Sequence, residues 1–318
     1  EATGDSNGMV VEGITIADFT HFSVRLITTN NRVEWVKTIG AWTYNCDGIS
    51  VFHYSTVKNC FIWANDDSIK VYRDGITFED IVCWQLTNGN IIQMAWNDAD
   101  AKDVTVRRVD ILHADWNNNQ FNRGVLGFVG NRYEYENNDN YLENYLIEDV
   151  VTETPVPVVL RVSPQAGYVS TVDGLTLRNW NVRQSDNGYK NYLYCSSPDH
   201  PFRNIVFDNF VFNGTKLTAQ NWEQLMNMQT QFIAYIQVTN TQNFRRYEKS
   251  QIFSETYFSR TARLCGIARV ELLGRRYRRR HLHPDVHAAR AARHQEQLRL
   301  AEQYDHRGGV ARRVVDGG

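Results

Sequence analysis

The chain has 318 residues, of which 42% are hydrophobic, so it is long enough for one large folded domain. Its net charge of −2 hides a division, because residues 1–243 hold 17 Lys and Arg against 28 Asp and Glu, and most of the Arg residues lie beyond. An acidic body repels polyanions at long range, which argues against nucleic acid, anionic membranes and polyanionic substrates, and no apolar run reaches the length of a membrane span.

The part before residue 243 repeats a short pattern in which apolar residues alternate with Thr, Asn or acidic residues. The copies read GITIADFT, STVKNCFI, GITFEDIV, DVTVRRVD, NYLIEDVV, DGLTLRNW and RNIVFDNF. Alternation of this kind indicates β-strands, and the copies recur about every 20 to 30 residues with one longer gap. A repeat of that length is typical of a solenoid coil.

A second kind of strand lies between these copies, as GISVFHYS, SIKVYRDG, IIQMAWND and VPVVLRVS. Two or three short strands per coil, separated by Asn, Asp and Gly, are what a coil needs if each strand pairs with its equivalent one coil away. We therefore predict an all-β fold for residues 1–243, a right-handed parallel β-helix. A propeller or a sandwich is the rival architecture, and either would show hairpin turns or a longer repeat.

Stacking of the coils sets a register that can be read from the sequence. Shifting YNCDGISVFH by one coil onto ANDDSIKVYR matches Asp47 with Asp67, and IIQMAW continues the stack. Trp63 and Trp84 also become equivalent. By the two-residue alternation of strands, three stacked isoleucines point inward, Ile49, Ile69 and Ile92, and two polar residues point outward, Lys70 and Gln93.

Asp47, Asp66 and Asp67 are the one cluster that the repeat explains poorly as structure. The register places the backbones of Asp47 and Asp67 about 4.8 Å apart. Two carboxylates at that distance repel by roughly 3 kcal/mol, enough to raise one pKa by about two units. A protonated carboxyl beside an ionised one is the equipment for cleaving glycosidic bonds. The alternative is that these aspartates form turns at the coil corners.

Aromatic residues on the same coils fit a neutral sugar, because aromatic faces pack on pyranose rings. They are Trp42, Trp63, Tyr72, Trp84 and Trp96. Each of them also suits a packed core or a stacked ladder. Lys70 and Gln93 are candidates either for binding sugar hydroxyls or for satisfying the carboxylates.

The motifs NCDGISV, WANDDSIKVY and NIIQMAW closely resemble the catalytic stretch of glycoside hydrolase family 49, the dextranases and isopullulanases. The resemblance covers roughly residues 9–240. It implies a secreted, inverting hydrolase of internal bonds in an α-glucan, with α-1,6 bonds of dextran first and α-1,4 bonds of pullulan second, and no metal or other cofactor. It implies that Asp66 is the general acid and that Asp47 and Asp67 position and deprotonate the attacking water. The substrate-binding residues expected are Lys70, Tyr72, Gln93 and Trp96.

Two alternatives stay open on the sequence. A polygalacturonase-like pectin hydrolase shares the β-helix, but its GHG and RIK signatures are missing here. A non-catalytic carbohydrate-binding β-helix would use the aspartates as corner residues. The family normally carries a β-sandwich and early coils ahead of the point where this chain starts, so we expect the helix to be truncated at its N-terminal side.

A short helix that closes or flanks the last coil is suggested for residues 215–232, TKLTAQNWEQLMNMQTQF.

Residues 244–318 differ in character, with GRRYRRRHLHP and HAARAARHQEQLRLAEQ. Three interpretations apply: a basic arm or helix for an acidic partner, a disordered tail, or the translation of a shifted reading frame. The five Cys show no spacing of metal ligands, so no metal site is expected. We also expect the chain to be a monomer.

Overall fold

The computed structural model describes residues 7–96, 100–118, 120, 122–128, 139–163, 169–195 and 198–241. All of them lie in one compact unit, Glu1–Ser254. A second unit, Glu255–Gly318, lies outside the described residues. The predicted tail of residues 244–318 and the boundary before it also lie outside them, so both stay predictions.

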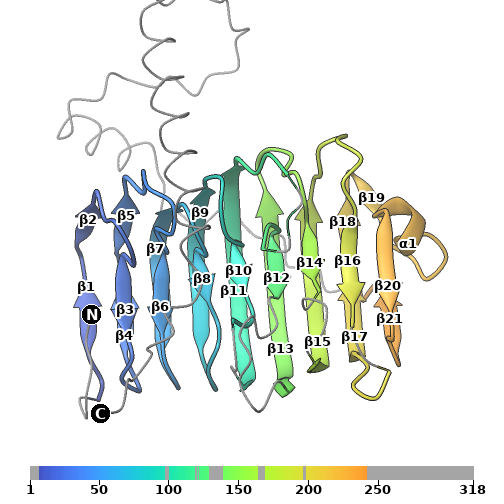
Figure 1. Cartoon of the computed structure of the whole chain (residues 1–318), viewed down its shortest axis with the longest axis horizontal. Coiled ribbons are helices and arrows are strands. Elements are labelled where there is room, and N and C mark those ends of the chain that lie inside the picture. The colour runs from blue at the N-terminus through green and yellow to red at the C-terminus, as the bar shows by residue number, and fades with distance from the viewer. Residues whose placement is uncertain are drawn as a thin grey trace, which may run out of the picture. The chain divides into compact units, whose positions relative to one another are not determined.

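One wall of the solenoid is a 13-stranded sheet (Figure 1). Its main path runs through β1 (Val10–Glu12), β4 (Arg32–Glu34), β7 (Thr56–Ala64), β9 (Thr77–Gln85), β11 (Ala101–Ala114), β13 (Asp139–Thr152), β15 (Val169–Val182), β17 (Arg203–Asp208) and β21 (Ile236–Thr239). Off this path lie β2 (Thr15–Ala17), β5 (Lys37–Ile39), β18 (Val211–Phe212) and β19 (Thr215–Lys216). Neighbouring strands pair in parallel, except that β18 and β19 are antiparallel.

The second wall is an eight-stranded sheet of short strands, one from each coil. In chain order they are β3 (Val24–Leu26), β6 (Ile49–Val51), β8 (Ile69–Lys70), β10 (Ile92–Gln93), β12 (Leu126–Phe128), β14 (Leu160–Val162), β16 (Asn191–Tyr194) and β20 (Met228–Gln231). Each pairs in parallel with its equivalent in the next coil. The predicted all-β solenoid, a parallel β-helix, is therefore confirmed.

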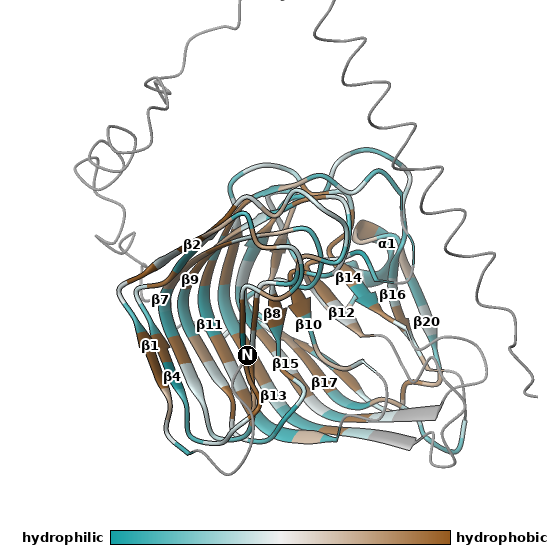
Figure 2. Cartoon of the chain, turned by 60° about the vertical axis from the view of Figure 1, so that its left-hand side comes forward, coloured by the Kyte–Doolittle hydropathy of each residue, from teal (hydrophilic) through white to brown (hydrophobic). Residues whose placement is uncertain are grey.

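The register also agrees with the sequence. Ile49 pairs with Ile69, which pairs with Ile92, and all three are completely buried. Trp63 pairs with Trp84, as expected. Figure 2 shows the result as bands of hydrophobic residues that continue from strand to strand across the long sheet. Burial of these stacked apolar rows is the main stabilisation of the solenoid.

The long strands bend at one equivalent residue in each coil, which has a left-handed backbone with φ near +55°. Asn and Asp dominate there because their short polar side chains tolerate this conformation better than other residues. The stacked positions are Trp35, Asn59, Asp80, Arg108, Asp149, Asn179 and Asn209.

Helix is scarce in the part of the chain that the structure describes. The sequence suggests a helix within residues 215–232, but only α1 (Trp222–Leu225) is helical, and strands β19 and β20 flank it. No described helix has the length and apolar character needed to cross a membrane. The four described cysteines, Cys46, Cys60, Cys83 and Cys195, are buried and unbridged.

Candidate active site

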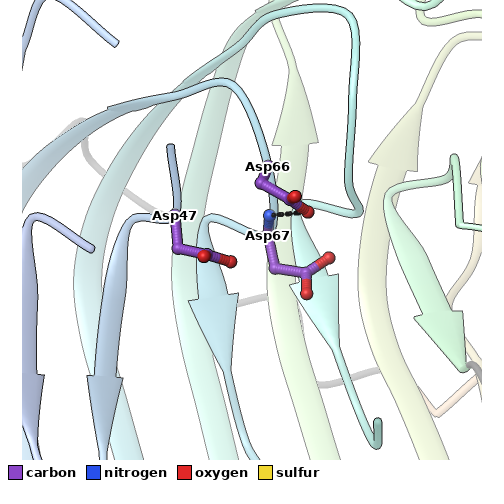
Figure 3. Close-up of side chains that lie close together, drawn as sticks. All are labelled: Asp47, Asp66 and Asp67. Carbon is purple, nitrogen blue, oxygen red and sulfur yellow. Dashed lines mark hydrogen bonds between the residues drawn. The ribbon is translucent and has the colours of Figure 1, made fainter. Parts of the chain in front are cut away.

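The three aspartates lie where two neighbouring coils turn from the long sheet into the short one. Asp47 precedes β6, and Asp66 and Asp67 precede β8. The amide of Gly48 donates to the Asp67 carbonyl at 2.9 Å, and the amide of Ile49 donates to the Ser68 carbonyl at 3.0 Å, which holds the two corners in step. Asp47 and Asp67 are therefore vertical neighbours, as the register predicts (Figure 3).

The three carboxyl groups are crowded. One oxygen from each lies within 4.8 Å of the others. The Asp66 side chain folds back so that its Oδ1 accepts a hydrogen bond from the Asp67 amide at 2.9 Å, drawn as a dashed line in Figure 3. Asp47 and Asp67 are only 5% and 2% exposed. Like charges this close and this dry are costly unless a cation or a proton offsets them.

Lys70 supplies the cation. Its ammonium forms an ion pair with Asp47 Oδ1 and lies 3.6 Å from Asp67 Oδ2. Asp67 is held further by the Tyr72 hydroxyl, which donates to Oδ2 at 3.1 Å, and by the backbone N–H of Asn90, which donates to Oδ1 at 3.0 Å. Both oxygens of Asp67 are thus engaged by the protein.

The crowding changes the proton affinities of the site. Burial raises the pKa of Asp47 from its ordinary value of 3.8 to about 6, opposed by the Lys70 charge and reinforced by Asp67. The pKa of Asp66 is raised well above 3.8, first by burial and then by the negative charges of Asp67 and Asp47. Asp66 therefore holds a proton at a pH where ordinary aspartates have lost theirs.

The same charges act on the other two titratable groups. Burial lowers the pKa of Lys70, but the carboxylates of Asp67 and Asp47 outweigh it, so the net shift is upward. The pKa of the Tyr72 hydroxyl is raised well above its usual value by burial and by the nearby aspartates. Lys70 thus stays cationic and Tyr72 stays neutral.

Two amide residues of the site are not among those predicted from the sequence. Asn88 donates to Asp66 Oδ2 at 2.8 Å. The buried Gln85 donates to the backbone carbonyls of Asp66 and Asn88, and its own Oε1 accepts from the Ser68 hydroxyl at 2.6 Å. Both lie one coil after the aspartates, in QLTNGN, so the coil spacing that matched Asp47 with Asp67 contained a signal for them.

The predicted substrate-binding residues fall in different surroundings. Gln93 lies beside Lys70 on the outer face of the short sheet, as predicted, but it has no exposed surface and accepts a hydrogen bond from Asn90. Trp96 is partly buried and follows β10 by three residues. Among the described residues, no hydrogen bond or ring contact joins Trp96 to the aspartates. Of the four predicted substrate-binding residues, only Lys70 and Tyr72 contact the carboxylates among the described residues.

The remaining aromatic candidates form a ladder outside the long sheet. The ring centroids of Trp42 and Trp63 are 5.1 Å apart, and those of Trp63 and Trp84 are 6.1 Å apart. His113 extends the ladder beyond Trp84 at 5.0 Å. Trp42 is 63% exposed, so this ladder is open at one end. The stacked interpretation of Trp63 and Trp84 thus fits their geometry.

The site provides a proton donor and two carboxylates in different surroundings, and one oxygen of each lies within 4.8 Å of the others. This is the requirement of acid and base catalysis on a glycosidic linkage. Three carboxyls also offer ligand atoms to a hard cation, but the Lys70 ammonium already occupies the space between two of them. The donor set suits a lysine-balanced proton-transfer site better than a metal site, and the expected absence of a metal stays a prediction.

No family model matches the chain. It is 26% identical to a dextranase of Arthrobacter sp. (strain CB-8) over 231 residues, which are 67% of this chain and 35% of that protein. It is 22% identical to an isopullulanase of Aspergillus niger over 194 residues, which are 56% of this chain and 33% of that protein. Among solved structures it is similar to Dex49A from Penicillium minioluteum, with a TM-score of 0.58 and 17% identity, covering 67% of this chain and 40% of that one.

These relatives confirm the predicted resemblance to the dextranases and isopullulanases, and the structural likeness agrees with the β-helix fold. The chain spans about a third of the length of the curated relatives that it matches.

Proposed function

We propose that this relative of dextranases and an isopullulanase is a glycoside hydrolase that cleaves internal bonds of an α-glucan with inversion. The observation that carries the proposal is the pair of unlike carboxyls, the partly buried Asp66 with its strongly raised pKa and the buried Asp47 beside Lys70. A carboxyl that keeps its proton next to one that has lost it matches the division into acid and base that glycoside hydrolysis needs.

In this proposal Asp66 is the general acid. It gives its proton to the glycosidic oxygen as the bond from that oxygen to the anomeric carbon breaks, so the leaving sugar departs as an alcohol. The Asp67 amide and the Asn88 side chain each donate to the carboxylate that remains. Hydrogen bonds to the ionised form offset part of the cost of leaving a negative charge in a buried place.

Asp47 and Asp67 are proposed to hold and deprotonate the attacking water. Carboxyl spacing alone does not support inversion, because inverting enzymes usually separate their two carboxyls by about 6.5 to 9.5 Å. Inversion is supported instead by the contacts that the oxygens of Asp47 and Asp67 already make. Asp67 is nearly buried with both oxygens bonded, and Asp47 is paired with Lys70, so neither suits direct attack on carbon. Either can accept a proton from an attacking water that lies next to its carboxylate.

Lys70, Tyr72, Gln93 and Trp96 are proposed as substrate-binding residues. Lys70 and Tyr72 adjoin the carboxylates and offer donors at the point of cleavage. The amide nitrogen of Gln93 has no hydrogen-bond partner among the described residues. Trp96, partly exposed after β10, offers an aromatic face of the kind that packs on pyranose rings. On this basis, Trp96→Ala should raise KM more than it lowers kcat.

The substrate class follows from the charge and from the relatives. The acidic body, with 28 acidic against 17 basic residues before residue 244, favours a neutral polysaccharide. The names of the relatives point to dextran first and pullulan second, with cleavage of α-1,6 and α-1,4 bonds respectively. A polysaccharide of that size is met outside the cell, so we propose a secreted enzyme. We also propose that it is a monomer and uses no cofactor.

The test is the release of reducing ends by the full chain from dextran, pullulan and polygalacturonate. We expect release from dextran or pullulan and none from polygalacturonate. Asp66→Asn should lower the rate by at least about 100-fold, since the proton donor is removed. Asp103→Asn, at an exposed aspartate away from the site, is the matched control and should keep full activity. Equal activity of Asp66→Asn and wild type contradicts the assignment, and cleavage of polygalacturonate alone establishes the pectin alternative.

A further inference from the structure

The Asp66 side chain is held by a polar network that reaches across the coils. Asn88 is 4% exposed and donates through Nδ2 to Asp66 Oδ2. Arg123, only 3% exposed, lies behind Asn88 and belongs to the coil that leads into β12. We propose that Asn88 and Arg123 are positioning residues: Arg123 fixes the orientation of the Asn88 amide, and Asn88 then holds the Asp66 carboxyl for proton transfer. This inference rests on the proposed role of Asp66 as the acid.

The orientation of the Asn88 amide follows from its neighbours. Its Oδ1 faces two donors, Arg123 Nη2 at 3.3 Å and Asn122 Nδ2 at 3.3 Å. An amide whose oxygen faces two N–H groups must present its nitrogen on the other side. That side is where Asp66 Oδ2 lies, at 2.8 Å. If the amide were turned over, its oxygen would face the carboxylate and its nitrogen would face two donors.

Arg123 is itself held too firmly to act merely as a surface charge. Its Nε donates to the Thr87 carbonyl at 2.9 Å, which fixes the residue next to Asn88. Its Nη2 also donates to the Tyr44 hydroxyl at 2.7 Å, across 79 residues of sequence. The guanidinium thus ties together the coils that carry Tyr44 and Asn88. A planar fork with several donors suits this role in a way that a lysine ammonium does not.

Two neighbouring carboxylates, Asp67 and Asp47, oppose the ionisation of Asp66 and raise its pKa, whereas the Lys70 cation lowers it. The negative charge of Asp66 in turn raises the pKa of the Tyr72 hydroxyl. The hydrogen bonds from Asn88 and from the Asp67 amide therefore stabilise the ionised form against burial and like charge. Removing the Asn88 donor disfavours ionisation, so the pKa of Asp66 must rise.

The experiment is a carbon-13 NMR titration of the aspartate carboxyls in the full chain, with the Asp66 signal identified by its loss in Asp66→Asn. In Asn88→Ala the midpoint of Asp66 should rise by about one pH unit, because one hydrogen bond to the charged form is lost. The high-pH limb of kcat against pH should move upward equally, and kcat should fall by about tenfold or more with a smaller change in KM. Asn88→Ser gives the same test if Asn88→Ala does not fold.

Arg123→Lys keeps the charge and removes the fork. Its Asp66 midpoint should move in the same direction by less, and the double variant should move no further than Asn88→Ala, since Arg123 acts through Asn88. The matched control is Asn31→Ala, a buried asparagine bonded to Thr28 and Ser55 away from the site, which should leave the Asp66 midpoint unchanged.

An unchanged Asp66 midpoint in folded Asn88→Ala or Asn88→Ser overturns the proposal, and so do additive shifts in the double variant. If the wild type cleaves no glucan but the midpoint moves as expected, the hydrolase function fails while the positioning of Asp66 by Asn88 stands.

Discussion

Lys70 forms an ion pair with Asp47 in which the two side chains are only 11% and 7% exposed. The same ammonium lies 3.6 Å from Asp67, so one cation balances two buried carboxylates. Because buried charges without a partner are strongly destabilising, the ionised state of the site depends on this lysine. The proposed base therefore needs the charge of Lys70 to stay ionised.

Removing that cation should damage stability and activity together. In Lys70→Met, we expect the free energy of unfolding at pH 7 to fall by about 3–5 kcal/mol, because a buried carboxylate loses its partner. The pKa of Asp47 should rise above its value of about 6, since Lys70 lowers it in the wild type. Urea unfolding and initial rates measure the two effects. Lys102→Met, at an exposed position, is the control, and an equal loss in both variants would rule out a special role for Lys70.

The rate should depend on pH with a low limb and a high limb. The proposed base must be ionised, so kcat/KM should rise with pH through about 6, the pKa of Asp47. It should fall again at higher pH where Asp66, whose pKa is raised well above 3.8, loses its proton. Initial rates on dextran from pH 3 to 10 would show this, and a rate that stays flat below pH 6 contradicts the assignment of Asp47.

The free energy of unfolding should show the cost of partly burying the Asp66 carboxyl. Its folded-state pKa is raised, so its contribution is present at low pH and is lost as pH rises from the ordinary value of 3.8 towards the folded value. Asp66→Asn mimics the protonated form and removes this loss. The variant should be more stable than wild type at pH 7, by about 1 kcal/mol or more, with little or no gain at pH 4. Urea unfolding at both values decides, and a gain of the same size at both would count against the raised pKa.

A glycine packed against the acid gives a test with an internal control. Gly89 has φ +74°, and a Cβ there would lie 2.2 Å from the Asp66 carbonyl carbon. Gly188 has a similar φ of +71° with no atom within 4 Å. Both alanine variants incur a conformational cost of about 1–2 kcal/mol, but only Gly89→Ala must displace Asp66. We expect thermal melting to show a cost in both, and activity to fall at least about 100-fold in Gly89→Ala alone. Full activity in Gly89→Ala would mean that the position of Asp66 is not critical.

The repeat made much of this arrangement predictable. Because every coil pairs with the next in parallel, matching Ile49 with Ile69 also fixed Asp47 beside Asp67 and Trp63 beside Trp84. The inward and outward positions followed from strand alternation alone. Coulomb repulsion predicted one raised pKa among the three crowded carboxyls. In the structure two are raised, those of Asp47 and Asp66, and burial is the larger cause of both.

Features set by loops between the coils could not be predicted in this way. Arg123 reaches Asn88 from a longer coil, and its contact with Tyr44 spans 79 residues that share no repeat position. Gln93 points outward by alternation, yet it is completely buried, because exposure depends on what covers the outer face and not on the strand itself. Of the helix suggested for residues 215–232, only α1 is formed, because the solenoid continues through β20.

In the proposed mechanism, Asp66 protonates the leaving oxygen while a water, held by Asp47 and Asp67, attacks from the opposite side. Proton NMR of the first reducing sugars released from dextran, recorded before mutarotation, is the decisive measurement. We expect the β-anomer to appear first, and we expect Asp66→Asn to release almost none. The α-anomer appearing first would show attack by a carboxylate and contradict it.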